Sequence, residues 1–276
     1  MTPGERRRLR FGVLGTDDAD VADQARQAEA LGFDIFALSD HLHGSRPTLE
    51  PWTALTWAAA ATERIAVLTD VLGLPYREPP VLAKMAETLD RLSGGRLILG
   101  LGNGGYEPEF AAFGLATRTP GQKVAALGEA IEILRALWSG RATTSDGEHY
   151  RLTDAVIAPP PEHPIPIWVG SYGPKALAQT GALADGWLPS IQRLEPDQAA
   201  AMKKAVDEAA VSAGRHPGDL SYACNIQVGS GDAGTTVRQL RDIAALGFDT
   251  FVVAGLTDSR AREQFAREIV PLVVGD

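Results

Sequence analysis

The chain has 276 residues, of which 45% are hydrophobic and 22% charged, and its formal net charge is −9. This is the composition of a globular protein that can bury a large core. The acidic balance argues against nucleic acid as a partner, and no apolar stretch is long enough to span a membrane. The basic start, Glu5–Arg10, is not followed by the apolar core of a signal peptide, so we expect a cytoplasmic protein.

Short apolar runs alternate with amphipathic segments along the chain. The expected strands are Leu9–Leu14, Asp34–Leu38, Ile65–Val71, Arg96–Leu101, Ile167–Gly170, Gly186–Pro189, Ser221–Val228 and Thr250–Ala254. The expected helices are Val21–Leu31, Thr53–Thr62, Pro80–Leu92, Gln122–Trp138, Lys175–Leu183, Pro196–Ala213, Thr235–Leu246 and Ser259–Val273. This alternation predicts an α/β protein, a (β/α)₈ TIM barrel formed by one domain over residues 1–276. A doubly wound sheet is the alternative, but Gly12–Asp17 lacks the glycine-rich phosphate turn that opens such a sheet.

Two features of the chain support a repeated αβ unit with one insertion. The segment Ala30–Phe36 recurs almost unchanged as Ala245–Phe251, each time between an expected helix and an expected strand. Gly32 in the first copy is placed for the left-handed turn that ends a helix. The long connection Ser139–Pro166 precedes the fifth strand and predicts a hairpin-like insertion or a lid.

Ser39, Asp40 and His41 directly follow the second expected strand. Catalytic groups of a barrel lie at the C-terminal ends of its strands, so the pattern places a carboxylate and an imidazole at the mouth. Histidine titrates nearest to neutral pH, which makes His41 the candidate proton donor or acceptor, oriented by Asp40. In the alternative interpretation, Asp40 caps a helix and His41 is a wall residue.

Three further strand ends carry polar residues or glycine. Asp70 ends an apolar strand, where a carboxylate is costly unless it is bonded, although an ordinary loop closed by proline is the alternative. Gly100–Tyr106 contains four glycines that let the backbone approach a ligand, or that form a simple turn. Gly170–Lys175 places a glycine turn before a helix that opens with Pro174, a pattern that favours phosphate binding over a plain tight turn.

Metal chemistry and cysteine chemistry find no support in the sequence. The five histidines lack metal-ligand spacing, so we expect no metal site. Cys224, the only cysteine, lies in an expected strand and is interpreted as a packed residue.

Several segments, taken in order, resemble the luciferase-like monooxygenase superfamily and, within it, the branch that depends on coenzyme F420, a deazaflavin. The resemblance extends from Phe11 to Pro271. The segments that carry it are Ser39–Leu42, Leu72–Pro79, Leu92–Gly102, Pro166–Gly170 and Ala184–Trp187.

The resemblance implies a barrel that binds FMN or deazaflavin at its C-terminal mouth. It also implies a non-proline cis peptide after the third strand, here between Asp70 and Val71. His41 and Asp40 are the expected catalytic pair. The expected cofactor-binding residues are Asp40, Thr69, Asp70, Val71, Asn103, Gly104, Gly105, Gly170, Ser171, Tyr172 and Gly173.

The sequence departs from the sugar-phosphate dehydrogenases of this branch at one position. Their catalytic glutamate corresponds to Gly105 here, and Glu107 and Glu109 lie nearby but out of register. The departure argues against glucose 6-phosphate as substrate.

The expected activity is hydride transfer between carbon C5 of F420 and a small organic substrate. The alternatives are an FMN-dependent monooxygenase on the same barrel and a barrel that binds the cofactor without turnover. A homodimer is expected by analogy with the family.

Overall fold

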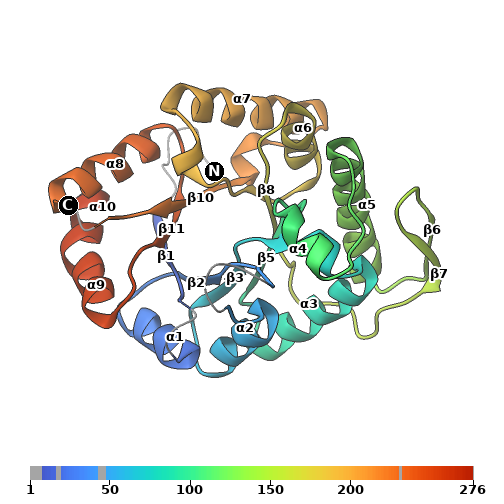
Figure 1. The fold of residues 1–276 in the computed structure, drawn as a ribbon, viewed down its shortest axis with the longest axis horizontal. Helices are drawn as coiled ribbons and strands as arrows, with labels where there is room; N and C mark the ends of the chain where they lie inside the picture. Colours follow the sequence, from blue (N-terminus) through green and yellow to red (C-terminus); the bar gives the residue numbers. More distant parts are fainter. Residues whose placement is uncertain (1–7, 17–19, 43–47, 230–231, 276) are drawn as a thin grey trace.

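Parallel strands close into a barrel that is surrounded by helices (Figure 1). The computed structural model describes residues 8–16, 20–42, 48–229 and 232–275. The barrel strands are β1 (Arg10–Leu14), β2 (Ile35–Leu38), β3 (Ala66–Thr69), β5 (Leu97–Gly102), β8 (Ile167–Gly170), β9 (Gly186–Trp187), β10 (Ser221–Gln227) and β11 (Thr250–Ala254). Pairing of β3 with β5 closes the ring, and the short β4 (Leu72–Gly73) continues β3 along β5. The predicted (β/α)₈ barrel is therefore confirmed.

Most of the helices lie outside the barrel, whereas α4 lies over its mouth (Figure 1). The helices are α1 (Val21–Ala30), α2 (Pro51–Ala60), α3 (Pro79–Ser93), α4 (Glu107–Ala112), α5 (Pro120–Trp138), α6 (Pro174–Leu183), α7 (Pro196–Ser212), α8 (Ala233–Ala245), α9 (Ser259–Gln264) and α10 (Val270–Val274). Proline in the first turn begins several of them, where its missing N–H costs no hydrogen bond.

Alternating side chains divide the core into two layers. On β2, Ile35 and Ala37 pack inside the barrel, whereas Phe36 and Leu38 pack against the helices. This is the period of two expected of a strand that is buried on both faces. The inner layer is a small cluster of buried side chains: Ile35, Ala37, Leu68, Ile98, Trp168, Leu188, Ala223 and Val252.

The repeated segments fold alike. Gly32 and Gly247 both adopt the left-handed conformation, with φ of 83° and 93°. Each ends its helix and turns the chain toward the next strand, as predicted. Asp34, which follows the first turn, accepts a hydrogen bond from the backbone N–H of Phe11 at 2.9 Å and so joins β2 to β1.

The sequence predicts one helix over Ser259–Val273, and the chain is helical throughout this segment, although part of it is not α-helical. A π-helical turn, Phe265–Ile269, separates α9 from α10. Pro271 explains the interruption, because it has no N–H to donate to the carbonyl of Arg267 and its ring crowds that turn.

The predicted insertion is a hairpin. Strands β6 (Thr143–Asp146) and β7 (Arg151–Ala155) pair antiparallel and project beside α5 (Figure 1). The insertion joins the end of α5 to the start of β8. That is the end of the barrel opposite to the strand C-termini, so the insertion does not act as a lid over the mouth.

The contact between β3 and β5 leaves no room for a side chain at Gly100. A Cβ atom there would lie 1.9 Å from the carbonyl oxygen of Thr69. We expect Gly100→Ala to lower the free energy of unfolding by about 3 kcal/mol, measured by urea denaturation, because backbone must move to relieve the clash. Gly121→Ala is the matched control, since its Cβ meets no atom within 4 Å and alanine favours the helix. Equal stabilities of Gly100→Ala and the wild-type protein would contradict this account.

Candidate active site at the barrel mouth

The C-terminal ends of the parallel strands bring four sequence-predicted segments to one edge of the barrel. Asp40 and His41 follow β2, Asp70 follows β3, and Asn103 follows β5. The turn that begins at Gly170 follows β8, which pairs directly with β5. The predicted site residues therefore share the end where barrel enzymes carry out their chemistry.

The buried carboxylate of Asp40 links three segments of the chain and does not orient His41. Its Oδ2 atom accepts hydrogen bonds from the backbone N–H of Gly73 at 2.8 Å and from Nη1 of Arg77 at 2.7 Å. Arg77 also bonds Glu50, whose carboxylate caps the start of α2. Burial disfavours the charge on Arg77, but its bonds to the two carboxylates outweigh burial and raise the pKa of Arg77. The expected pairing of Asp40 with His41 is replaced by an ion pair that holds the mouth together.

His41 instead lies beside Glu109. The distance from Nδ1 of His41 to Oε2 of Glu109 is 3.5 Å. The Glu109 side chain is fully buried, whereas that of His41 is 51% exposed, so the imidazole connects a buried carboxylate to the open mouth. Tyr76 donates a hydrogen bond from its hydroxyl to the same carboxylate oxygen. Burial and the neighbouring Glu109 raise the pKa of the Tyr76 hydroxyl, which therefore stays protonated.

The sequence prediction gave Glu109 no role, because Glu109 lies out of register with the glutamate of the sugar-phosphate dehydrogenases. Tyr106 and Pro108 begin a short helix, α4, that turns Glu109 back toward β2. The only available signal was a proline next to two glutamates after the loop, which indicates the start of a helix.

The bond between Asp70 and Val71 is cis, as the resemblance implied. Nearby, the hydroxyl of Thr69 donates to the carbonyl of Gly100 and accepts from its N–H, both at 2.9 Å. A Cβ atom at Gly102 would lie 2.7 Å from Cγ2 of Val71. Gly100 and Gly102 therefore make room for Thr69 and Val71 of the same chain. The prediction that the glycines of this segment let the backbone approach a ligand does not hold for these two.

Asp70 is partly buried at the C-terminal end of β3. Its Oδ2 atom accepts a hydrogen bond from Nδ2 of Asn225 at 2.6 Å. Burial raises the pKa of Asp70 to about 6, and the bond from Asn225 offsets only part of this effect. Asn225 is a second residue that sequence reasoning missed, because the two residues lie 155 positions apart.

The turn after β8 offers backbone donors more than side-chain donors. The Ser171 hydroxyl is buried and hydrogen-bonded to Oγ1 of Thr180 at 2.9 Å, so it is engaged within the protein. The Tyr172 hydroxyl accepts a hydrogen bond from the N–H of Ser190. A Cβ atom on Gly173 would meet no atom within 4 Å. The N–H groups that begin α6 are therefore the anion donors that this turn can supply.

Two observations at the mouth fit a bound flavin-type cofactor. The Oδ1 atom of Asn103 is buried without a hydrogen-bond partner within the described ranges, which is costly unless a ligand supplies a donor. Open space faces Gly105, which follows β5, and Gly173, which follows the neighbouring strand β8. Gly104 is not open, because a Cβ atom there would lie 2.5 Å from Cζ of Phe110, and its carbonyl accepts a hydrogen bond from Nζ of Lys123 at 3.2 Å.

The structure also bears on the other classes of site. Cys224 is completely buried, and burial raises the pKa of its thiol, as expected of a packed residue. The described ranges contain no group of three or more His, Cys, Asp or Glu side chains placed to hold a metal ion. None of the helices in these ranges is both long and apolar enough to cross a membrane.

The fold and the mouth define a (β/α)₈ barrel of the kind that binds a cofactor at the C-terminal ends of its strands. Residues 11–263 match the family described as luciferase-like monooxygenase. The chain belongs to that family.

Relatives of known name extend this assignment. The chain is 31% identical over 281 residues to an F420-dependent glucose-6-phosphate dehydrogenase of Nakamurella multipartita, covering 98% of this chain and 81% of that one. It is 32% identical over 247 residues to the enzyme of the same name from Beutenbergia cavernae, covering 87% and 73%.

Solved structures share the fold at low sequence identity. An F420-dependent secondary alcohol dehydrogenase in complex with an F420–acetone adduct is similar with a TM-score of 0.88 and 19% identity, covering 97% of this chain and 99% of that one. The F420-dependent tetrahydromethanopterin reductase from Methanopyrus kandleri is similar with a TM-score of 0.83 and 19% identity, covering 96% and 99%.

The raised pKa of Asp70 predicts a pH dependence of stability. In the folded protein the Asp70 carboxyl keeps its proton up to about pH 6, whereas its ordinary pKa is 3.8. Because the unfolded chain loses this proton more readily, the free energy of unfolding falls as pH rises between these two values. We expect Asp70→Asn to be more stable than the wild-type protein by roughly 2–3 kcal/mol at pH 7 and nearly equal at pH 4, measured by urea denaturation. Asp242→Asn, at an exposed position on α8, is the control and should change little. A wild-type stability that does not fall relative to Asp70→Asn between pH 4 and pH 7 would exclude this role.

Proposed function

We propose that the protein is an F420-dependent oxidoreductase that transfers a hydride between the deazaflavin and a small organic substrate. The observation that carries the proposal is the half-exposed His41 imidazole, backed by the buried carboxylate of Glu109, at the mouth of a luciferase-like barrel. The F420-dependent names of relatives that are 31% and 32% identical support the choice of cofactor.

The residues proposed to hold the cofactor lie on three strand ends. Backbone N–H groups of Gly173 and the first turn of α6 would bind its phosphate, as helix N-termini commonly do. Asn103 and the backbone of Gly105 would bond the edge of the ring system, while the Asp70–Val71 segment would support its face. Asp40 contributes indirectly, because its ion pair with Arg77 fixes the loop after β4.

The protein's own contribution to catalysis is to position the substrate and move its proton. Bound deazaflavin supplies carbon C5 as hydride acceptor or donor. With Nδ1 facing Glu109, the Nε2 atom of His41 is free to take the proton of a substrate hydroxyl during oxidation and to return it during reduction. Glu109 is a positioning residue, since its carboxylate lies 3.5 Å from Nδ1 and fixes the orientation of the imidazole. Tyr76 stabilises the Glu109 carboxylate by donating a hydrogen bond to it.

A small alcohol or carbonyl compound fits this site better than glucose 6-phosphate. Gly105 offers open space instead of a carboxylate at the position of the sugar-phosphate dehydrogenases' glutamate. Lys123, the cation near this loop, is engaged by Glu107 at 3.0 Å and by the Gly104 carbonyl, so it is not free to bind a substrate phosphate. The exposed ring of Tyr106, which contacts His41 edge-on, provides an apolar wall instead.

The proposal includes a homodimer. Trp57 is 65% exposed on α2 and Val81 is 58% exposed on α3, two helices that contact each other. Large apolar side chains on adjacent helices commonly mark a protein interface.

The choice of cofactor predicts that F420 binds more tightly than FMN. Gly173→Asp should weaken F420 binding by about tenfold or more without loss of folding, because the carboxylate would point into open space beside the anion donors. Gly121→Asp adds the same charge at an open position on α5 and is the matched control. Fluorescence titrations in which FMN binds more tightly than F420 would favour the monooxygenase alternative.

The proton role of His41 predicts a loss of turnover without a comparable loss of cofactor affinity. His41→Ala should slow single-turnover oxidation of reduced F420 by aldehydes and ketones by about 10²–10⁴-fold. His41→Gln keeps the shape and a hydrogen-bonding group but cannot carry the proton, so it should be similarly slow. Near-normal turnover of His41→Gln would leave His41 as a wall residue, and no turnover of the wild-type protein with any substrate would favour the non-catalytic alternative.

The same turnover assay distinguishes the role of Glu109 from that of Glu107, its neighbour on α4. Glu109→Gln keeps the acceptor for Tyr76 but removes the charge beside His41, and we expect turnover to fall about tenfold while F420 affinity is retained. Glu107→Gln, whose side chain is 61% exposed, is the matched control and should turn over normally.

A further inference from the structure

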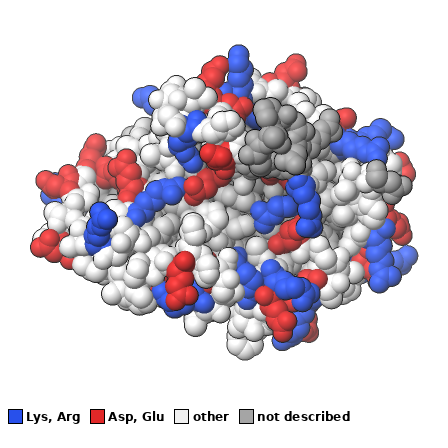
Figure 2. Space-filling model, turned by 180° about the vertical axis from the view of Figure 1, so that it is seen from behind, with Lys and Arg blue, Asp and Glu red and all other residues white. Residues whose placement is uncertain are grey.

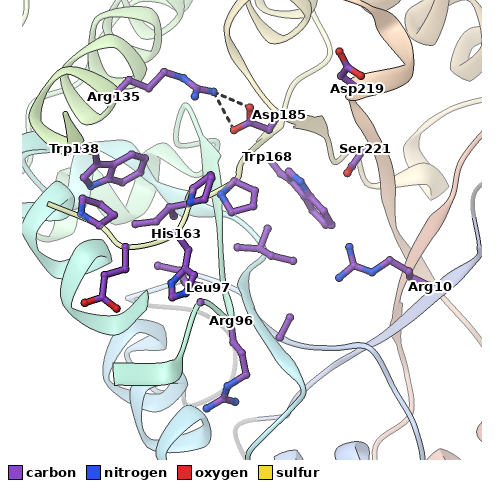
Figure 3. A pocket seen from close by; sticks show the side chains of 18 of the residues that line it. Arg10, Arg96, Leu97, Arg135, Trp138, His163, Trp168, Asp185, Asp219 and Ser221 are labelled. Carbon is purple, nitrogen blue, oxygen red and sulfur yellow. Dashed lines mark hydrogen bonds and ion pairs between the residues drawn. The ribbon is translucent and has the colours of Figure 1, made fainter. Parts of the chain in front are cut away.

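A cavity of about 910 Å³ lies at the end of the barrel opposite to the mouth. Its wall is formed by residues at the starts of barrel strands, including Arg10 on β1, Leu97 on β5, Trp168 on β8 and Ser221 on β10. Figure 3 shows these side chains around a common space, with Trp138 and His163 closing one side. The volume is within the range of sites that hold small organic ligands.

Arg10 is the unusual member of this wall. Its guanidinium points into the cavity and lies 5.9 Å from the centre of the Trp168 ring (Figure 3). Within the described ranges this guanidinium makes no hydrogen bond and no ion pair. Burial lowers the pKa of Arg10, and the carboxylates of Asp34 and Asp249 oppose this effect from a distance. A partly buried cation without a hydrogen-bond partner is costly unless a ligand supplies the missing acceptor.

Other charges at the cavity are already engaged. Arg135 bonds both carboxylate oxygens of Asp185, at 3.0 and 2.9 Å (Figure 3). Glu162 forms an ion pair with Arg91 on the outer side of the loop. The opposite charges within each of these pairs neutralise each other, so Arg10 is the donor that faces the cavity.

The remaining balance of charge is positive. Arg96 bonds carbonyl oxygens and the hydroxyl of Thr62, and among the described residues it forms no direct ion pair, although Glu29 opposes its charge from a distance. Among the described residues that line the cavity, Asp219 at the rim is the single carboxylate that has no ion pair. Figure 2, which views the molecule from behind, shows Lys and Arg side chains interspersed with Asp and Glu on this face, so the positive balance is confined to the lining of the cavity. The cavity therefore favours an anion.

We propose that this cavity is a second ligand site, which binds a small organic anion with a carboxylate or phosphate head group and an apolar body. The two-donor fork of Arg10 binds the head group, and the hydroxyl of Ser221, which faces the same space, adds a donor (Figure 3). The apolar body lies against Trp168 and the prolines Pro164 and Pro166. The site is separated from the mouth by the packed inner layer of the barrel, so it is independent of the proposed oxidoreductase activity.

Calorimetric titration with benzoate, phenyl phosphate and uncharged phenol tests this site, with and without saturating F420. We expect saturable binding of at least one of the two anions under both conditions, and the tighter one identifies the preferred head group. Phenol should bind more weakly than either. Arg10→Met should weaken anion binding by about tenfold or more, because it removes the charged fork. Arg267→Met removes an exposed arginine paired with Glu263 and should bind as the wild-type protein does.

Arg10→Lys keeps the charge without the fork and extends the test if Arg10→Met does not fold. We expect a smaller loss of affinity, greater for benzoate than for phenyl phosphate, since a carboxylate depends more on paired donors. The site is excluded if neither anion binds saturably, if phenol binds as tightly, if the Arg10 variants bind like the wild-type protein, or if F420 displaces the probe.

Discussion

A carboxylate that is buried at the mouth of the barrel must find a partner, and this requirement organises the mouth. Asp40 is neutralised by Arg77, Asp70 is bonded by Asn225, and Glu109 is bonded by Tyr76 beside the imidazole of His41. The partners are a cation, an amide and a hydroxyl, so the three carboxylates are compensated in different ways. The mouth thereby separates a structural charge, a group that titrates in mildly acidic solution, and a carboxylate aimed at a histidine.

The fold could be predicted where the pattern is local. The apolar run of β2 and the repeated Ala30–Phe36 segment indicate strands and helix ends without knowledge of their neighbours. The partner of Asp40 could not be predicted, because Arg77 lies 37 positions further on and reaches it only through the loop after β4. The contact between Glu109 and His41 could not be predicted for a similar reason, since it depends on how α4 turns the chain back toward β2.

Glycine-rich strand ends show another limit of sequence reasoning. A glycine in the sequence can indicate that a side chain would not fit, but it does not indicate which atoms occupy the space. At Gly100 and Gly102 the space is taken by Thr69 and Val71 of the neighbouring strand, so these glycines serve barrel closure. At Gly105, three residues further along the same segment, no atom lies within 4 Å of the added Cβ, so this glycine leaves room for a ligand. The two uses look alike in the sequence because these glycines belong to one glycine-rich segment at the end of β5.

The open space at Gly105 has a consequence for how this branch of the family diversifies. No backbone strain and no neighbouring atom oppose a side chain at this position, so a change there carries little penalty in folding. At Gly100 and Gly102, by contrast, an added side chain would collide with the neighbouring strand end. A single substitution at Gly105 can therefore add a new side chain to the mouth without a compensating change in the scaffold.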